Sequence, residues 1–351
     1  MARPLISVLM STYNDEKYIE KAINSILAQT MSDFEIIIVN DASTDSTPCI
    51  LARLQSQDER IKLIENTKNL GLTKSLNIAL EHCQGSYIAR MDSDDISLPH
   101  RFERQLRCFQ NNPSVVLLGS NVRQIDKDGK LLNSTQLPLQ DQQIRSTCLF
   151  LNPFAHPTIM LRAEVLQERK IKYDVSFDTS QDWELWTRLL KYGNCMNIEE
   201  SLVYYRVHSG SVSARKAVQQ RKNTLRVQNR YIAHILPNYR KNDEFLDNIL
   251  KYILGNSIAV SEKDLKTLEV ICLDVLNFIT NVKRARVLSD VRYLERFVVW
   301  RVLRSMIRNR SIFFLVLKKI LTSHFSSFLY APIQGVRAFK QRIGDTKTVN
   351  L

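Results

Sequence analysis

Three carboxylates lie within four residues, directly after a strand-like apolar run at residues 87–91: Asp92, Asp94 and Asp95. Like charges this close repel, and each raises the pKa of its neighbours. A divalent cation removes that cost, because Mg²⁺ and Mn²⁺ bind one or two carboxylates together with substrate phosphates. Ligands of an open α/β sheet bind beyond the carboxyl ends of its strands. The cluster therefore predicts a metal and diphosphate site, although the triplet alone fits a solvated acidic loop equally well.

Polar groups also follow the first two strand-like runs. Residues 11–16 read Ser-Thr-Tyr-Asn-Asp-Glu, whose hydroxyl, amide and aromatic groups could hold a nucleobase. Taken alone, this stretch is only a helix-cap signal. After the second run, Asp41 could accept the imide N–H of uracil, whereas Asp45 or Ser46 would cap the next helix.

A fourth group of interest is Asp182, which lies between Gln181 and two nearby tryptophans, Trp183 and Trp186. Aromatic faces suit sugar rings, and an apolar wall can tune a carboxylate as a general base. Considered by itself, Asp182 fits a simple helix N-cap better.

The segments that must position these groups are of two kinds, which alternate along the chain and differ in the spacing of their apolar residues. Strand-like runs predict a sheet, and the segments between them have helical spacing. This alternation predicts an α/β fold with a parallel sheet and right-handed crossovers. The expected strands are 6–10, 34–39, 61–64, 87–91, 115–122 and 158–161, with a hairpin turn at 126–129; the expected helices are 16–29, 46–54, 72–82, 99–111, 141–150, 163–169 and 181–191.

The pattern changes near residue 216, where strand signals fade and basic helical sequence begins. We therefore predict a catalytic domain at 1–214 and a helical subdomain at 215–351. The chain carries a net charge of +13, and the C-terminal part holds an excess of 16 basic residues while the N-terminal part is slightly acidic. A basic tail favours an anionic surface. Residues 292–328 interleave arginine with bulky apolar groups, which predicts a membrane-surface helix; an ordinary core helix or a homodimer contact fits the same pattern.

The cysteines and the long apolar runs of the sequence narrow the possible classes of protein. The six cysteines are scattered without a Cys-x-x-Cys pair, which argues against a zinc site and a disulfide framework. The N-terminus lacks the apolar core of a signal peptide, and no run reaches the roughly 18 apolar residues of a transmembrane helix. We therefore expect a cytoplasmic protein, peripheral at the inner face of the plasma membrane if the tail binds lipid.

Together, the motifs resemble the family 2 inverting glycosyltransferases, which have the GT-A fold. The resemblance covers about residues 5–210 and excludes the C-terminal helices. Each stretch is weak alone, but their order and spacing together are specific. The matching stretches lie at residues 7–14, 38–45, 69–72, 90–95, 181–183 and 205–208.

The resemblance implies a nucleotide pocket with a metal. Its nucleotide-binding residues would be Thr12, Tyr13, Asn14, Glu16, Asp41, Arg90, Asp92 and Ser93. Asp41 would bind the uracil. Residues 92–94 look like the Asp-x-Asp motif of the family, with Asp92 near the ribose and Asp94 on Mn²⁺ or Mg²⁺.

The resemblance also assigns the remaining site residues. Asp182 would be the catalytic base, with Gln181 where the family usually has glutamate. His208 would approach the metal or diphosphate. Trp183, His156 and Asp95 would contact the sugar or acceptor, although a structural role fits both His156 and His208 as well.

The implied reaction moves one sugar from a UDP-sugar to a hydroxyl of a glycan or lipid-linked acceptor, as in bacterial surface polysaccharide assembly. Processive synthases of the family add transmembrane helices and a Gln-x-x-Arg-Trp motif, which this sequence lacks. The competing enzyme class is a nucleotidyltransferase, which should have a glycine-rich loop after the first strand. A non-catalytic protein that binds nucleic acid through the basic tail is a third hypothesis, but the tail has no zinc-finger or RNA-recognition signature, so we expect no nucleic acid partner.

Overall fold

The computed structural model describes residues 3–208, 210, 216–236, 282 and 293. The chain divides into two compact units, residues 1–231 and 232–351. The sheet and the helices below belong to the first unit, apart from the last residues of α9. The predicted boundary after residue 214 thus precedes a helical stretch that groups with the first unit. Residues 292–328, predicted to bind a membrane, lie outside the described residues.

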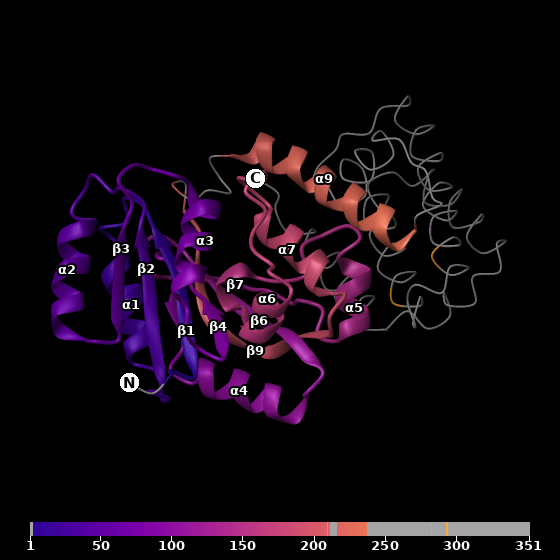
Figure 1. Cartoon of the computed structure of the whole chain (residues 1–351), viewed down its shortest axis with the longest axis horizontal. Helices are drawn as coiled ribbons and strands as arrows, with labels where there is room; N and C mark the ends of the chain where they lie inside the picture. Colours follow the sequence, from indigo (N-terminus) through magenta and orange to yellow (C-terminus); the bar gives the residue numbers. More distant parts are fainter. Residues whose placement is uncertain (1–2, 209, 211–215, 237–281, 283–292, 294–351) are drawn as a thin grey trace, which may run out of the picture. The chain divides into compact units, whose positions relative to one another are not determined.

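A nine-stranded sheet is the centre of the described part of the first unit, in the order β3-β2-β1-β4-β8-β6-β9-β5, with β7 paired to β6 (Figure 1). The strands are β1 (Ile6–Thr12), β2 (Phe34–Asn40), β3 (Ile61–Glu65), β4 (Tyr87–Arg90), β5 (Ile96–Ser97), β6 (Val115–Ile125), β7 (Leu131–Ser134), β8 (Met160–Arg162) and β9 (Asn194–Arg206). The helices are α1 (Ile19–Leu27), α2 (Thr47–Gln57), α3 (Leu72–His82), α4 (Arg101–Asn111), α5 (Asp141–Thr147), α6 (Ala163–Glu168), α7 (Gln181–Leu189) and α9 (Ala217–Ile235), with a 3-10 turn η1 (His156–Thr158).

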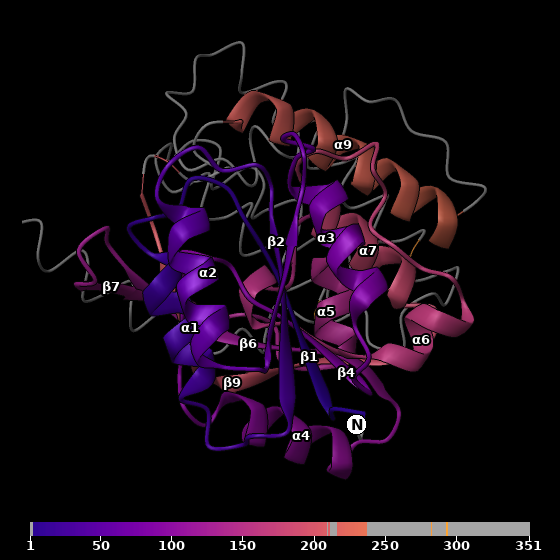
Figure 2. The ribbon, with the colours of Figure 1, turned by 60° about the vertical axis from the view of Figure 1, so that its left-hand side comes forward.

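The half of the sheet formed by β3, β2, β1 and β4 is parallel, as the sequence predicts. Alternate residues of β1, such as Ile6, Val8 and Met10, are buried against the apolar stripe of α1. Helices α1 and α2 cover one face and α3 the other (Figure 2). Burial on both faces explains the nearly continuous apolar runs of these strands. Thr12 pairs with Asn40, so β1 and β2 end at one edge of the sheet.

The other half of the sheet is mixed, whereas the alternation of strands and helices predicts parallel strands. Strand β8 is antiparallel to β4 and β6, whereas β9 is parallel to β6 and antiparallel to β5. Strands β5 and β9 are not among the strands predicted from the sequence. Residues 194–201 are largely polar, and pairing with β6 is interrupted by register shifts, so this strand shows no clean alternation.

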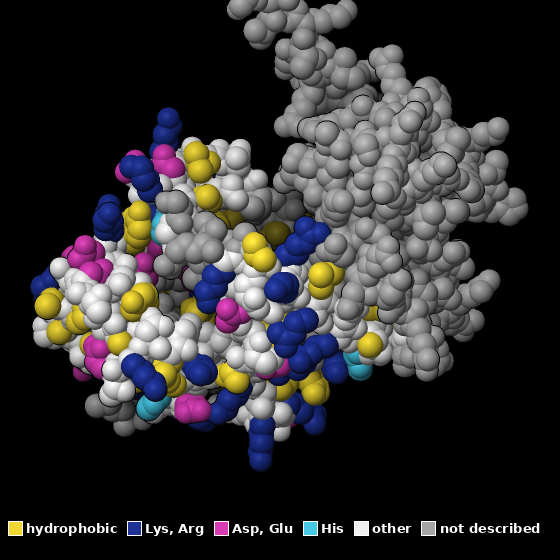
Figure 3. Space-filling view, turned by 90° about the horizontal axis from the view of Figure 1, so that it is seen from above, with side chains coloured by type: hydrophobic (Ala, Val, Ile, Leu, Met, Phe, Trp, Pro, Cys, Tyr) yellow, Lys and Arg dark blue, Asp and Glu magenta, His cyan; other side chains and the backbone are white. Residues whose placement is uncertain are grey.

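Among the described residues, no helix is long and apolar enough to cross a membrane. Five cysteines are free in the described part of the chain: Cys49, Cys83, Cys108, Cys148 and Cys195. Lysine and arginine side chains are spread over the visible described face, with acidic side chains between them (Figure 3).

Candidate active site

The loops after β1, β2 and β4 line a cavity of about 1030 Å³. Parallel strands bring their carboxyl ends to one edge, so polar side chains far apart in sequence share this space. Segments from the mixed half of the sheet and from α9 complete the walls. Of the predicted site residues, the cavity is lined by Thr12, Tyr13, Asp41, Arg90, Asp92, Ser93, Asp94, His156, Asp182, Trp183 and His208.

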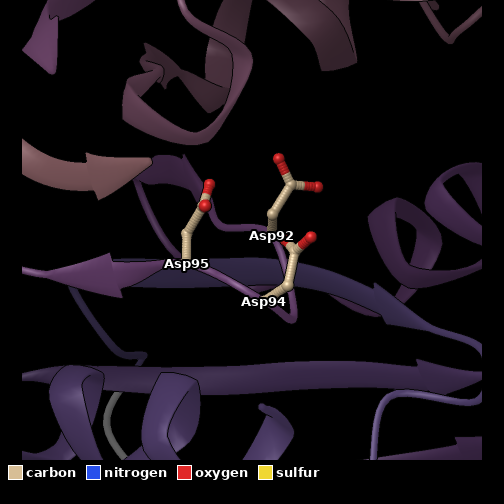
Figure 4. Close-up of side chains that lie close together, drawn as sticks. All are labelled: Asp92, Asp94 and Asp95. Atoms are coloured by element: carbon tan, nitrogen blue, oxygen red, sulfur yellow. The ribbon is translucent and has the colours of Figure 1, made fainter. Parts of the chain in front are cut away.

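The acidic cluster after β4 is the best candidate cation site of the described residues. One ligand atom from each of Asp92, Asp94 and Asp95 lies within 4.8 Å of the others. Their carboxylates lie on the same side of the loop (Figure 4). His208 Nε2 is 2.9 Å from Asp94 Oδ2, so the two residues predicted to hold one ion are in direct contact.

The electrostatics of the cluster also fit a cation. Burial, and next the charge of Asp92, raise the pKa of Asp94 to about 6, which a hydrogen bond with His208 partly offsets. Burial, and next the charges of Asp94 and Asp92, raise the pKa of Asp95 well above its ordinary value. Arg90 forms an ion pair with Asp92. Asp95 Oδ2 is buried without a hydrogen-bond partner, and such an oxygen suits a metal ion, which would satisfy it.

Asp95, which was predicted to contact sugar or acceptor, is the most buried of the three carboxylates. Its exposed fraction is 1%, and it is absent from the cavity lining. The backbone N–H of Arg206 donates to Asp95 Oδ1 at 2.7 Å, which anchors the cluster to the end of β9. Pairing with this distant strand could not be read from the sequence.

The loop after β1 supplies a polar wall and one residue that the sequence analysis missed. Tyr13 is 39% exposed at the cavity. Asp15 also lines the cavity, and its Oδ2 accepts hydrogen bonds from Ser93 Oγ at 2.5 Å and Thr12 Oγ1 at 3.2 Å. Burial raises the pKa of Asp15. Asp15 lies in the polar stretch 11–16, which could have indicated a site residue, but the same stretch also fits a helix cap.

Asn14 and Glu16 are placed outside the cavity lining, although both were predicted to bind nucleotide. The backbone N–H of Thr44 donates to Asn14 Oδ1 at 2.8 Å. The backbone N–H of Ser46 donates to Glu16 Oε2 at 2.9 Å. Both side chains therefore hold the loop after β1 against the loop after β2, and they would shape a nucleotide pocket from behind.

Asp41 is almost fully buried and organises the turn before α3. Its Oδ1 accepts from Asn66 Nδ2 at 2.7 Å and from the backbone N–H of Leu70 at 2.8 Å. Its Oδ2 accepts from the backbone N–H of Gly71 at 2.8 Å. A carboxylate has about four acceptor positions, so one remains for the predicted imide N–H.

Asp182 lies in the first turn of α7 and lines the same cavity as the acidic cluster. Burial raises its pKa, whereas hydrogen bonds from the backbone N–H of Trp183 and from Asn152 lower it. Asn152 Nδ2 donates to Asp182 Oδ2 at 2.6 Å. A raised pKa brings a carboxylate closer to the range in which a general base works well.

The neighbouring tryptophans are largely buried, although Trp183 is also among the residues that line the cavity. Trp183 is 3% exposed and its indole N–H donates to Cys148 Sγ, while Trp186 is fully buried. His156 lines the cavity, and its Nε2 lies 3.0 Å from the hydroxyl of Tyr173. Burial lowers the pKa of His156 well below its ordinary value, so the ring is neutral at pH 7.

Comparison with known proteins agrees with this architecture. The family model described as glycosyl transferase family 2 matches residues 7–170. The O-antigen biosynthesis glycosyltransferase WbnJ of Escherichia coli is 36% identical over 214 residues, which are 59% of this chain and 81% of that protein.

Two solved structures share the fold. The S. aureus protein TarS 1-349, in complex with UDP-GlcNAc, has a TM-score of 0.55 and 18% identity, covering 90% of this chain and 92% of that chain. The mannosyltransferase PcManGT from Pyrobaculum calidifontis, in complex with GDP-Man and Mn2+, has a TM-score of 0.52 and 14% identity, covering 93% of this chain and 82% of that chain. The chain therefore belongs to glycosyl transferase family 2 and is a glycosyltransferase with the GT-A fold.

Proposed function

We propose that this chain is a metal-dependent inverting glycosyltransferase that moves one sugar from a UDP-sugar to a hydroxyl of a glycan or lipid-linked acceptor. The observation that carries the proposal is that Asp92, Asp94 and Asp182 line one cavity. The first two belong to a carboxylate cluster suited to a cation and diphosphate. The third is a partly buried carboxylate suited to proton transfer. Nucleotide-sugar transfer needs both functions at one site.

Each group has a distinct role in the proposed mechanism. Mn²⁺ or Mg²⁺ held by Asp94, with His208 and the other cluster carboxylates nearby, would supply Lewis-acid stabilisation of the diphosphate leaving group. Asp182 takes the proton from the acceptor hydroxyl as that oxygen attacks the anomeric carbon. Direct displacement inverts this centre, so an α-linked donor gives a β-linked product. Asp92 and Asp41 are assigned to the ribose and the uracil, respectively.

The relatives support the substrate classes. WbnJ acts in O-antigen biosynthesis by its name, which favours cell-surface polysaccharide assembly for this chain. The complexes of TarS with UDP-GlcNAc and of PcManGT with GDP-Man and Mn2+ favour a nucleotide-sugar donor and a divalent metal. UDP is preferred because Asp41 retains an acceptor position for a uracil imide N–H.

The first test is calorimetry of the full chain with UDP, GDP and CMP, each with and without Mn²⁺. We expect UDP binding that requires Mn²⁺ and disappears in Asp94→Ala. The matched control is Asp128→Ala, which removes an exposed carboxylate from the β6–β7 hairpin and should bind UDP like the parent protein. Tight binding of GDP alone would contradict the proposed UDP-sugar donor. Binding of UDP that does not depend on Mn²⁺ would contradict the proposed metal dependence.

A second test addresses the base. Asp182→Asn should keep Mn²⁺-dependent UDP binding but lose sugar transfer by about 10²–10⁴-fold, because it removes a general base. Retained turnover would exclude Asp182 as the base. The anomeric configuration of the product, read by NMR, should be β from an α-linked donor, and an α-linked product would exclude the inverting mechanism.

A further inference from the structure

Two chain segments meet at the carboxylate of Asp182. One is the turn at residues 178–181 that leads into α7, and the other is the loop after α5 that carries Asn152. Both segments line the cavity. Neither segment is part of a strand, so their relative position depends on contacts with other parts of the chain.

The first segment is held by Asn223 of α9. Asn223 is fully buried, and its Nδ2 lies 3.0 Å from Asp178 Oδ1, 2.9 Å from Thr179 Oγ1 and 3.1 Å from Thr179 O. The next residue, Ser180, has φ 57° in the left-handed region, which is unfavourable for a residue with a Cβ. The bonds from Asn223 fix the chain immediately before this strained turn and therefore fix where α7 begins.

The second segment is held by Gln228 of the same helix. Gln228 is also fully buried, and its Nε2 donates to the backbone carbonyl of Phe150 at 2.9 Å. Two residues later, Asn152 donates to Asp182 Oδ2 at 2.6 Å, and its own Oδ1 accepts the backbone N–H of Phe154 at 3.2 Å. The Asn152 amide is thus oriented at both ends.

Helix α9 therefore contacts both segments through the side-chain amides of Asn223 and Gln228. Figures 1 and 2 both show α9 next to α7. This helix lies beyond residues 7–170, to which the family model is matched, and these contacts come from its residues before Tyr231, within the first unit.

We propose that Asn152, Asn223 and Gln228 are positioning residues for the Asp182 carboxylate, with α9 as the brace that holds the base and its orienting amide together. This inference rests on the proposed role of Asp182 as the base. It adds a specific claim: the amide of Asn152 directs one carboxylate oxygen, leaving the other for the acceptor hydroxyl, and Gln228 acts only through the Asn152 loop.

The environment of Asp182 predicts the direction of a pH effect. Arg90 from the end of β4 favours the ionised carboxylate, as do the N–H groups of Trp183 and Asn152. Tyr173 also faces it and remains neutral at pH 7, because burial raises the pKa of this phenol. Removing the Asn152 donor therefore raises the pKa of Asp182, since a bond to the charged form is lost.

The first experiment compares the full chain with Asn152→Ala and Asn152→Leu. The probes are UDP-glucose, UDP-galactose and their N-acetyl forms, each assayed separately with Mn²⁺, and the readout is release of UDP with water as acceptor. We expect kcat to fall about 10–100-fold with little change in KM. The acidic limb of the kcat profile should move to higher pH, because the charged form of Asp182 loses a hydrogen bond. An unmoved limb in both variants would overturn the proposal.

The second experiment is a double-mutant cycle of Asn152→Ala and Gln228→Met, the latter chosen because it keeps the side-chain volume. We expect Gln228→Met alone to lower kcat, and to add little once Asn152 is already alanine. Val218→Ala on the exposed face of α9 is the control and should leave kcat unchanged. Additive effects would show that Gln228 acts independently of the Asn152 loop and would overturn the brace.

The failures can be told apart. If Asp182→Asn retains turnover, or if the full chain does not release UDP, the proposed function fails. In that case the carboxyl titration of Asp182 is followed by NMR with ¹³C-labelled aspartate in the full chain, assigned by Asp182→Asn. A higher titration midpoint in Asn152→Ala supports the Asn152 contact independently of activity, and an unchanged midpoint overturns it.

Discussion

Arg101 shows how a single buried charge can support the acidic cluster without belonging to it. Its side chain is fully buried, and its Nη2 donates to the carbonyls of Arg90 at 2.7 Å and Ile159 at 3.2 Å. Burial lowers the pKa of this guanidinium to about 9. Arg101 thus ties the end of β4, from which the acidic cluster follows, to the residue after η1.

We predict that Arg101→Met lowers the free energy of unfolding by about 2–3 kcal/mol, because buried carbonyl groups lose their donors. The measurement is urea denaturation followed by circular dichroism. Arg104→Met is the control on the same helix: Arg104 is 47% exposed and pairs with Glu200 at the surface, so its loss should cost at most about 0.5 kcal/mol. Equal costs for the two variants would contradict the assigned role of Arg101.

At the scale of elements, the turn before α3 both depends on a glycine at positive φ and forms part of the cavity wall. Gly71 has φ 87°, donates its N–H to Asp41 and lines the cavity. Gly129 in the β6–β7 hairpin has a similar φ of 91° but is not part of the lining. An added Cβ would meet nothing within 4 Å at either position. Both glycines therefore have a backbone that is unfavourable for alanine, and only Gly71, with ψ 157° in a region that almost only glycine adopts, lines the cavity.

Gly71→Ala and Gly129→Ala should each lower the free energy of unfolding by about 1–3 kcal/mol, because alanine is strained at positive φ. Only Gly71→Ala should also weaken Mn²⁺-dependent UDP binding, since it moves the loop that Asp41 holds. Urea denaturation and calorimetry on both variants check this. If Gly129→Ala weakened UDP binding equally, the loss would reflect stability and not the turn.

At the scale of the whole molecule, the net charge of +13 predicts attraction to anionic surfaces. The excess lies in residues 215–351, mostly outside the described part of the chain. We expect the full chain to co-sediment with vesicles of phosphatidylglycerol and phosphatidylcholine, and binding to weaken as salt rises from 50 to 500 mM by screening. Pure phosphatidylcholine vesicles are the control. Absence of binding to the anionic vesicles at low salt would argue against a peripheral membrane role.

The sequence was sufficient for the parallel half of the sheet and for the groups at its carboxyl edge. Strands β1 to β4 and helix α3 have strong local periodicity, so their positions could be predicted, and with them the placement of Asp41, Asp92 and Asp94. Asp182 was also predicted at the start of a helix. Their chemical roles stay predictions, although their presence in one cavity is a property of the structure.

Only the tertiary structure decided which distant groups meet. Asn152 reaches Asp182 across 30 residues, and Asn223 reaches Asp178 across 45, and no local pattern encodes such pairs. Likewise, the burial of Asp95 and Trp183 follows from packing against other segments, and their contacts with sugar or acceptor stay predictions. Local periodicity determines where helices and strands form, whereas side-chain burial and long-range hydrogen bonds exist only once those elements have packed together.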